Sequence, residues 1–559
     1  MNDLAQLISS YIASLFNQTV EVEISRPEPE FGDASTNIAL KLAKPLQKAP
    51  REIADLIAAG LSGHPQIASA EVAGPGFINI RFTDATLVGL LKTPPAKPLQ
   101  NQEMLVEFSD ANPFKAMHLG HLYSTIAGDA ISGVLEANGA TVRRISYHGD
   151  VGMHVARAIW AVRQDQKEHP EKPLEAYFET DTTIGNFYAK GARAYKESDA
   201  AKAEIETVNR QVYEYVLGKG DNGAIGELYE FGRSASFAAF DKVFKTLDVQ
   251  FSPNGRYLES KSTVFGLEFV KQNTGKVFEE SDGAVVYKGE KVGLHTRVFI
   301  NSKGLPTYEA KDLGLAEMKH RDYPNAAQSI IITANEQTEY FKVMLAALAE
   351  INPEVAAKSR HVAHGFLSLV GGKMSSRNGI SDKETAAYLL ASVKETIQAK
   401  YPEIDAQTQN DVYLAAVKYT FLKNRIGGDI VFDVDESIST EGNSGPYVQY
   451  AHARARSILA KSSSAETLAV DVQFDAAERS LAVKLTEWND VLQRAGEELL
   501  PHLVCTYLYE LSQVFNRFYE KSRVIGDPRE VTRLGLIAQY ANVLQTGLIT
   551  LGIPAPERL

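Results

Sequence analysis

The order of apolar and polar segments between residues 104 and 145 constrains the fold of this chain more than any other feature. Residues 104–108 (MLVEF) are apolar enough for a buried strand, and after a polar loop apolar residues recur at helical spacing from Leu119 to Ala130. Residues 141–145 (TVRRI) then predict a second strand. A strand, a helix and a strand in this order form a βαβ unit, so the sequence predicts a parallel sheet.

The 559 residues divide into three predicted domains, as roughly 150 residues per domain would allow. Residues 1–98 predict a small α/β domain that ends in a stiff linker with three prolines. Its strands are expected at residues 20–24 and 77–82. Residues 99–405 predict the parallel-sheet domain, and residues 406–559 predict an antiparallel all-α helix bundle.

The predicted parallel-sheet domain carries an insertion at about residues 155–300. This insertion is helical and rich in charge to about residue 250, and from about residue 264 its pattern becomes β-like. Beyond it, residues 329–333 (SIIIT) form a short apolar run, typical of an interior parallel strand.

Composition excludes several kinds of site. Cys505 is the one cysteine, so a disulfide framework, a Cys-rich zinc ribbon and an iron–sulfur cluster are excluded. With 12 histidines a His/Asp metal site stays possible, but no HxxEH or HExxH motif supports one, and we expect no protein-bound structural metal. No apolar run approaches the roughly 18 to 20 residues of a membrane span. No Lys or Arg precedes Arg26, which argues against a targeting peptide, so we expect a cytoplasmic protein.

The net charge of −12 disfavours non-specific coating of nucleic acid, because neutralising phosphates needs clustered cations. Recognition of nucleic acid through a local patch and shape stays open.

The most informative segment is the polar loop after the first strand, residues 107–121. Ligands bind at such strand ends, and the N–H groups of a helix N-terminus attract phosphate. His118 and His121 share one face of the first helical turn, and Gly120 lets a flat ring approach the backbone. With Lys115 they can stabilise charge on a phosphoryl group. The alternative is a helix start with two surface histidines.

A second segment, residues 371–379 (GGKMSSRNG), lies about 250 residues later. Its paired glycines, cations and hydroxyls suit a mobile loop that closes over a triphosphate. Taken alone, it fits an ordinary solvated basic loop better.

Together the two segments resemble the HIGH and KMSKS signatures of class I aminoacyl-tRNA synthetases, written here as residues 118–121 (HLGH) and 373–377 (KMSSR). The resemblance narrows to arginyl-tRNA synthetases. Matching motifs run through the chain: Gly32 and Asp33, residues 76–79 (GFIN), 107–121, 304–312 (GLPTYEAKD), 337–341 (QTEYF), 445–454 (GPYVQYAHAR) and 556–559 (PERL). The resemblance implies a Rossmann-like catalytic domain between a tRNA-contacting N-terminal domain and a helical anticodon-binding domain.

The resemblance also implies an activity: ATP-dependent attachment of L-arginine to its tRNA through an arginyl-adenylate, with ATP used as its Mg²⁺ complex and activation dependent on bound tRNA. The implied catalytic residues are Lys115, His118, His121 and Lys373. The implied ATP-binding residues are His118, Gly120, His121, Lys373, Met374 and Ser375. The implied arginine-binding residues are Glu107, Ser109, Asn112, Tyr308, Asp312 and Gln337.

The chemistry of arginine agrees with this set. A guanidinium offers five donors and keeps its proton, so its pocket needs carboxylate and phenol acceptors. Tyr308 and Asp312 are four residues apart and share a face if their segment is helical. Without the family pattern, an exposed carboxylate near a helix start would explain them better.

Three positions depart from the family pattern. Ser376 replaces the second KMSKS lysine, Ala116 a common proline and Tyr340 a frequent histidine. By the family's precedent Lys115 substitutes for the missing lysine, which makes it the leading catalytic cation. Residues 147–152 (YHGDVG) resemble a family turn whose role stays open.

Tyr447, Tyr450 and Arg454 recur at helical spacing in the predicted bundle. The resemblance implies that they contact the tRNA anticodon, where aromatic and guanidinium planes stack on splayed bases. Buried helix packing explains the tyrosines equally well. We expect a monomer.

Two other functions fit parts of the sequence. A nucleotidyltransferase acting on a small phosphorylated substrate would use the histidine pair, but it would leave the N-terminal and helical domains without a role. A catalytically inactive paralogue that binds only RNA is disfavoured because Lys115, His118, His121, Tyr308 and Asp312 are intact.

Overall fold

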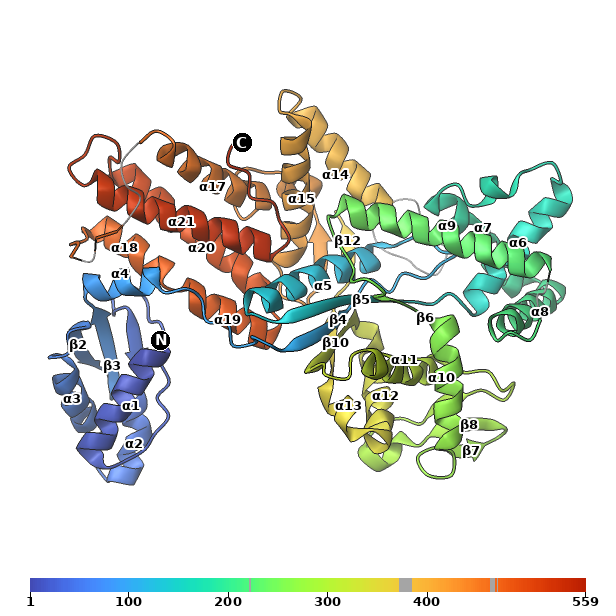
Figure 1. The fold of residues 1–559 in the computed structure, drawn as a ribbon, viewed down its shortest axis with the longest axis horizontal. Helices are drawn as coiled ribbons and strands as arrows, with labels where there is room; N and C mark the ends of the chain where they lie inside the picture. The colour runs from blue at the N-terminus through green and yellow to red at the C-terminus, as the bar shows by residue number, and fades with distance from the viewer. Residues whose placement is uncertain (221–222, 371–384, 463–467, 470) are drawn as a thin grey trace.

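The computed structural model describes residues 1–559 except residues 221–222, 371–384, 463–467 and 470. Figure 1 shows an elongated molecule with the N-terminal domain at one end, in blue, and a bundle of inserted helices at the other, in green. The central parallel sheet lies between the inserted helices and the C-terminal helical domain, in orange and red. None of the described helices combines the length and apolar character that crossing a bilayer requires.

The N-terminal domain is built on an antiparallel sheet of order β1-β3-β2. Its elements are α1 (Asn2–Phe16), β1 (Ala34–Thr36), α2 (Ile38–Leu46), α3 (Pro50–Leu61), β2 (Ile67–Ala73), β3 (Phe77–Phe82) and α4 (Asp84–Lys92). The predicted strand at residues 77–82 is confirmed as β3. The predicted strand at residues 20–24 is wrong. This segment pairs with the three-residue β1 only after residue 24, at an isolated bridge between Ser25 and Ser35.

The central sheet has five parallel strands in the order β11-β10-β4-β5-β6. They are β4 (Glu103–Glu107), β5 (Thr141–His148), β6 (Arg256–Leu258), β10 (Gln328–Ala334) and β11 (Ser359–His364). The predicted strands at residues 104–108, 141–145 and 329–333 are thus confirmed. Val106 and Ile332 face α5 (Leu119–Ala137) on one side, while Leu105 packs on the other side against α11 (Tyr308–Asp322). Both faces are covered, as a parallel sheet requires.

Two insertions leave the sheet at its carboxyl edge. The first, between β5 and β6, consists mainly of α6 (Met153–Glu168), α7 (Asp181–Glu197), α8 (Asp199–Val216) and α9 (Ala224–Thr246), which share a core of their own. We call these four helices the inserted bundle. The second lies between α10 (Glu259–Gln272) and α11 and contains an antiparallel sheet of β7 (Glu279–Ser281), β8 (Ala284–Tyr287) and β9 (Arg297–Ile300).

The prediction of a β-like pattern from about residue 264 is wrong at its start, since α10 continues to Gln272. The physical reason is close helix packing. A side chain at Gly266 would clash with the backbone of Ala310, so a glycine is needed where α10 crosses α11.

The predicted C-terminal helix bundle is confirmed. Its helices are α15 (Ala406–Leu422), α16 (Val434–Ser437), α17 (Gly445–Leu459), α18 (Ala476–Leu485), α19 (Trp488–Glu498), α20 (His502–Lys521) and α21 (Glu530–Thr550). The region is not helical throughout, because β13 (Ile430–Phe432) pairs in parallel with β12 (Leu367–Leu369). Helices α12 (Thr338–Ile351) and α13 (Pro353–Lys358) connect β10 to β11, and α14 (Ala386–Lys400) precedes α15. Helices α15, α19 and α21 contact α5, so the bundle packs on the helix that starts at the histidine pair.

Candidate active site

A cleft of about 380 Å³ opens at the carboxyl ends of the central strands. Its walls come from the loop after β4, the end of β5, the start of α10, α11 and the turn after β10. Five of the six residues predicted to bind arginine line it: Glu107, Asn112, Tyr308, Asp312 and Gln337. A larger cleft of about 530 Å³, between α9, α15 and the C-terminal tail, is lined by none of the described predicted site residues.

Ser109, the sixth, lies beneath the cleft and is fully buried. Its Oγ accepts a hydrogen bond from Thr125 Oγ1 at 2.7 Å, and its backbone N–H donates to Ser124 Oγ at 3.2 Å. Ser109 has φ 63°, a left-handed conformation that is uncommon outside glycine. Its contacts therefore tie the strained loop to α5.

The acidic half of the site contains Glu107, Glu259, Asp312 and the phenol of Tyr308. Two of its carboxylates are paired with buried lysines: Glu107 with Lys319 Nζ, and Glu259 with Lys311 Nζ, each at 2.6 Å. Such pairs satisfy charges that would otherwise be costly to bury.

The hydrogen-bond partner of the Asp312 carboxylate is a phenol and not a cation: the carboxylate accepts a hydrogen bond from the Tyr340 hydroxyl. Burial raises the pKa of Asp312 to about 8, although the Tyr340 hydrogen bond lowers it. An arriving cation therefore stabilises the charged form of this carboxyl. Tyr308, 58% exposed and one helical turn away, adds a phenol at the mouth of the cleft.

The donor half of the site is the start of α5 with Lys115, His118 and His121. The two imidazole rings stack with their centroids 3.7 Å apart. His118 Nδ1 accepts a hydrogen bond from Gly120 N–H at 3.1 Å, and His121 Nδ1 accepts one from His118 N–H at 3.4 Å. Because each Nδ1 is an acceptor, the neutral rings carry their proton on Nε2 and present it to a ligand as a donor.

Both rings are neutral at pH 7. Desolvation of the ring and, after it, the nearby Lys115 lower the pKa of His118 to about 4, although the residue as a whole is exposed. Burial, followed by His118 and Lys115, holds the pKa of His121 well below its usual value. The pair therefore offers neutral hydrogen-bond donors, and Lys115 supplies the charge.

The two halves adjoin. Burial raises the pKa of Glu259, and Lys311 and, to a smaller extent, Lys115 oppose that rise, so the Lys115 ammonium acts across the boundary. Lys373, Met374 and Ser375, predicted to bind ATP, lie outside the described residues.

Comparisons with known families cover the chain almost from end to end. Residues 2–82 match the family described as "Arginyl tRNA synthetase N terminal domain", residues 87–434 "tRNA synthetases class I (R), catalytic domain", and residues 448–559 "DALR anticodon binding domain". The chain belongs to the arginyl-tRNA synthetase family. Members of this family are enzymes that attach arginine to tRNA, and this chain is one of them.

Individual relatives span the same length. An arginine–tRNA ligase of Bdellovibrio bacteriovorus is 31% identical over 561 residues, which cover 96% of this chain and 94% of the relative. One from Bacteroides fragilis is 27% identical and covers 100% and 99%. The solved arginyl-tRNA synthetase of Thermus thermophilus is 25% identical, covers 100% of both chains and superposes with a TM-score of 0.81. That of Plasmodium falciparum, at 21% identity and a TM-score of 0.79, supports the fold.

The sequence did not identify Glu259 as a site residue of this synthetase. A side chain on Gly149 would clash with Asn112 Oδ1 and lie 3.0 Å from Glu259 Oε1, so this glycine admits both groups to the cleft. The neighbouring Asp150 is fully buried and accepts hydrogen bonds from Ser260 N–H at 2.8 Å and Ser260 Oγ at 2.7 Å. The turn at residues 147–152 thus fixes the start of α10, where Glu259 lies. The resemblance of this turn to a family motif was the sequence signal that could have indicated Glu259.

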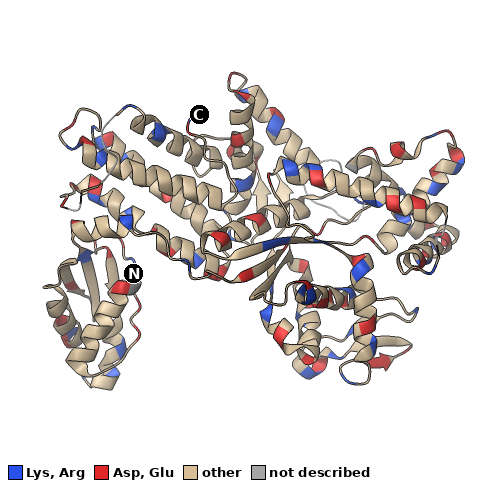
Figure 2. Cartoon of the chain, in the orientation of Figure 1, with Lys and Arg blue, Asp and Glu red and all other residues tan. Residues whose placement is uncertain are grey.

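The three residues predicted to contact tRNA all lie on α17 but differ in surroundings. The Tyr447 hydroxyl accepts a hydrogen bond from Asn516 Nδ2 at 2.9 Å and its ring packs on Tyr509, as the packing alternative expects. Tyr450 is 49% exposed, and the exposed Arg454 stacks over Tyr519 at 4.6 Å. Figure 2 shows that acidic and basic residues are interspersed along this domain.

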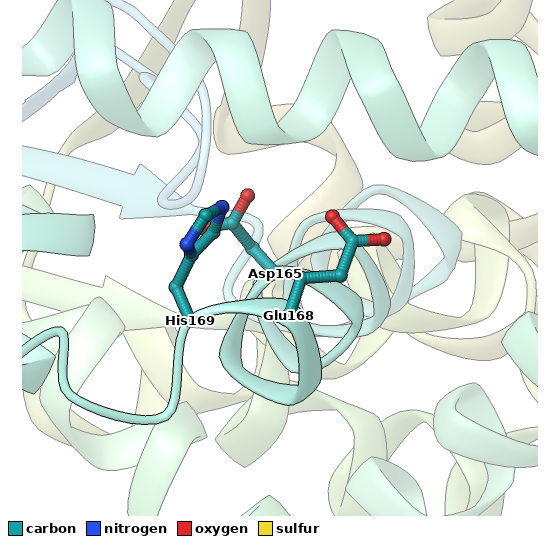
Figure 3. Close-up of side chains that lie close together, drawn as sticks. All are labelled: Asp165, Glu168 and His169. Atoms are coloured by element: carbon teal, nitrogen blue, oxygen red, sulfur yellow. The ribbon is translucent and has the colours of Figure 1, made fainter.

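One group in the described part of the chain has side chains close enough together to hold a metal ion: Asp165, Glu168 and His169, at the end of α6 (Figure 3). It lies outside the cleft. Asp165 is already within ion-pair distance of Lys172 and Lys190, at 3.3 and 3.5 Å, and the other two residues are exposed. Exposed acidic clusters are common without a metal, so this group is no argument for one.

Proposed function

We propose that the acidic half binds the guanidinium of arginine and that the donor half binds the phosphates of ATP, so that an arginine carboxylate oxygen attacks the α-phosphorus. The observation that carries this proposal is the position of Asp312. It is a half-buried acceptor, not paired with a cation in the described structure, in a cleft whose loop continues into the stacked histidines.

Arginine recognition follows from the donors of its side chain. The planar guanidinium fork can be met by Asp312, by the Tyr308 phenol and by the carboxylates of Glu107 and Glu259. Asn112 and Gln337 hold the α-amino and carboxylate groups of the substrate, and Ser109 shapes the loop beneath them. Lysine is excluded because its point-like ammonium cannot satisfy several acceptors in one plane.

Activation forms a bond between arginine and the α-phosphorus and releases pyrophosphate. The Nε2–H groups of His118 and His121 and the ammonium of Lys115 stabilise the charge that develops on the phosphoryl oxygens. Gly120 admits the flat nucleotide, and Lys373, Met374 and Ser375 close over it by analogy with the family. ATP enters as its Mg²⁺ complex. Catalysis is by positioning and electrostatics, without a protein nucleophile.

The 2′-hydroxyl of the terminal adenosine of tRNA then attacks the carbonyl carbon of the arginyl-adenylate, so that an ester bond forms, the bond to phosphate breaks and AMP leaves. The tRNA is held by the N-terminal domain, residues 1–98, and by the helical domain, residues 406–559, where Tyr450 and Arg454 present exposed planes and Tyr447 supports them. The catalytic domain, residues 99–405, activates arginine only when tRNA is bound. The enzyme acts as a cytoplasmic monomer.

Arginine-dependent ATP–pyrophosphate exchange tests this assignment. The assay is run with and without arginine tRNA, with lysine as the control substrate. We expect exchange with arginine and tRNA together and none with lysine. Exchange without tRNA would refute tRNA-dependent activation, and absence of exchange while tRNA still binds would refute the catalytic assignment.

A further inference from the structure

The inserted bundle packs against the loop that carries Lys115. Phe114, the preceding residue, is fully buried and has φ 65°, a conformation that is rare for a bulky side chain. Its ring lies in the core of the bundle, with its centroid 6.2 Å from that of Phe178 and 6.3 Å from that of Tyr229. Its backbone N–H donates to Ser236 Oγ of α9 at 3.0 Å. The strained conformation is thus held by contacts from another part of the chain.

Two glycines let the helices approach this loop from both sides of Lys115. On α9, a side chain at Gly232 would clash with the Phe114 ring. On α7, a Cβ at Gly185 would lie 3.3 Å from Ala116 Cβ, tighter than an ordinary contact. The residues before and after Lys115 are therefore in contact with α9 and α7, respectively.

Lys115 itself contacts the bundle through Tyr188. Its ammonium lies 4.9 Å from the centroid of the Tyr188 ring, which is half-buried and packs against the core of the bundle. Among the described residues, no carboxylate lies within ion-pair distance of Lys115, in contrast to Lys311 and Lys319. An aromatic face attracts a cation but does not neutralise it, so the ammonium keeps its charge for an anion.

We propose that Tyr188 is a positioning residue for Lys115, and that the inserted bundle holds this cation beside the start of α5. The proposal rests on the catalytic role of Lys115 proposed above. It explains how Lys115, a loop residue, can substitute for the absent second lysine of the KMSKS signature. Phe114 and Ala116 fix the backbone of Lys115, and the Tyr188 ring restricts where the Lys115 ammonium can lie.

The test compares Tyr188→Leu, which removes the aromatic face, with Tyr188→Phe, which keeps it. A matched control is Tyr195→Leu, since Tyr195 lies on the same helix and stacks with Arg157 at 4.7 Å. In arginine-dependent ATP–pyrophosphate exchange with tRNA, we expect kcat of Tyr188→Leu to fall about fivefold with the KM for arginine within about twofold of the parent. Tyr188→Phe and Tyr195→Leu should keep the parental kcat.

The same substitution in a Lys115→Met background separates positioning from a general structural role. We expect Tyr188→Leu to cause no further loss of kcat there, since the group it positions is gone. An equal fivefold loss in both backgrounds, or an unchanged kcat in the single variant, would overturn the proposal. A Lys115→Met variant with parental kcat would instead refute the role of Lys115. Thermal unfolding checks the fold, and Tyr188→Met replaces Tyr188→Leu if the latter does not fold.

Discussion

The two halves of the site differ in how their charged groups are paired. In the acidic half, Glu107 and Glu259 are neutralised by buried lysines, and Asp312 is held by a phenol. In the donor half, the histidines are neutral donors and Lys115 faces an aromatic ring. A pocket for a cationic side chain can thus be stable while empty because its acceptors are satisfied internally. A pocket for a triphosphate keeps its donors uncommitted.

This comparison separates recognition from chemistry. If the acidic half selects arginine, its variants should change kcat/KM for arginine most strongly. If the donor half stabilises the transition state, its variants should lower kcat and leave the KM for arginine nearly unchanged.

The largest expected effect is on Asp312. Asp312→Asn keeps the shape of the side chain but removes the acceptor charge that a buried guanidinium needs, so we expect kcat/KM for arginine to fall about a thousandfold. Steady-state exchange kinetics over a range of arginine concentrations measure this. Tyr340→Phe, which removes only the hydrogen bond to Asp312, should cost far less. A loss of under tenfold in Asp312→Asn would refute Asp312 as the main guanidinium acceptor.

The next effect concerns Glu107 and its partner. Glu107→Gln leaves the Lys319 ammonium buried without its counter-charge, so we expect the free energy of unfolding to drop by about 3 kcal/mol. Denaturant titration measures the drop. Glu52→Gln, which breaks the exposed pair with Lys48, is the control and should change it by less than about 0.5 kcal/mol. Equal changes in both variants would contradict a structural role for the buried pair.

A smaller loss is expected at the histidine pair. His121→Ala removes one Nε2–H donor and the stacking partner of His118, so kcat should fall at least tenfold, which is about 1.4 kcal/mol or more. The KM for arginine should stay within about twofold. Exchange kinetics at saturating ATP provide both constants, and unchanged turnover would refute the role of His121.

The smallest effect predicted for the acidic half is a pH dependence. The pKa of Asp312 is about 8, so at lower pH the carboxyl is mostly protonated in the free enzyme and must ionise to pair with a guanidinium. Raising the pH increases the ionised fraction, and kcat/KM for arginine should rise about eightfold from pH 7 to 8.5. Asp312→Asn should abolish this rise. A flat profile in the parent enzyme would contradict the raised pKa.

Sequence patterns predicted the features that are local in the chain. The strands β3, β4, β5 and β10 follow from periodicity, and the shared face of His118 and His121 follows from their spacing of three residues. The charge pairs of the acidic half join residues far apart, 212 positions for Glu107 and Lys319 and 52 for Glu259 and Lys311, so no local pattern indicated them. The alternation at residues 20–24 predicted a strand that tertiary pairing does not complete, since strand propensity depends on context.

The division between the two halves is tested most directly by Lys115→Met, with kcat and the KM for arginine measured in tRNA-supported ATP–pyrophosphate exchange. We predict that kcat falls about a hundredfold while the KM for arginine stays within about twofold, because Lys115 acts on the phosphates. A parental kcat, or a loss confined to the KM for arginine, would contradict the account.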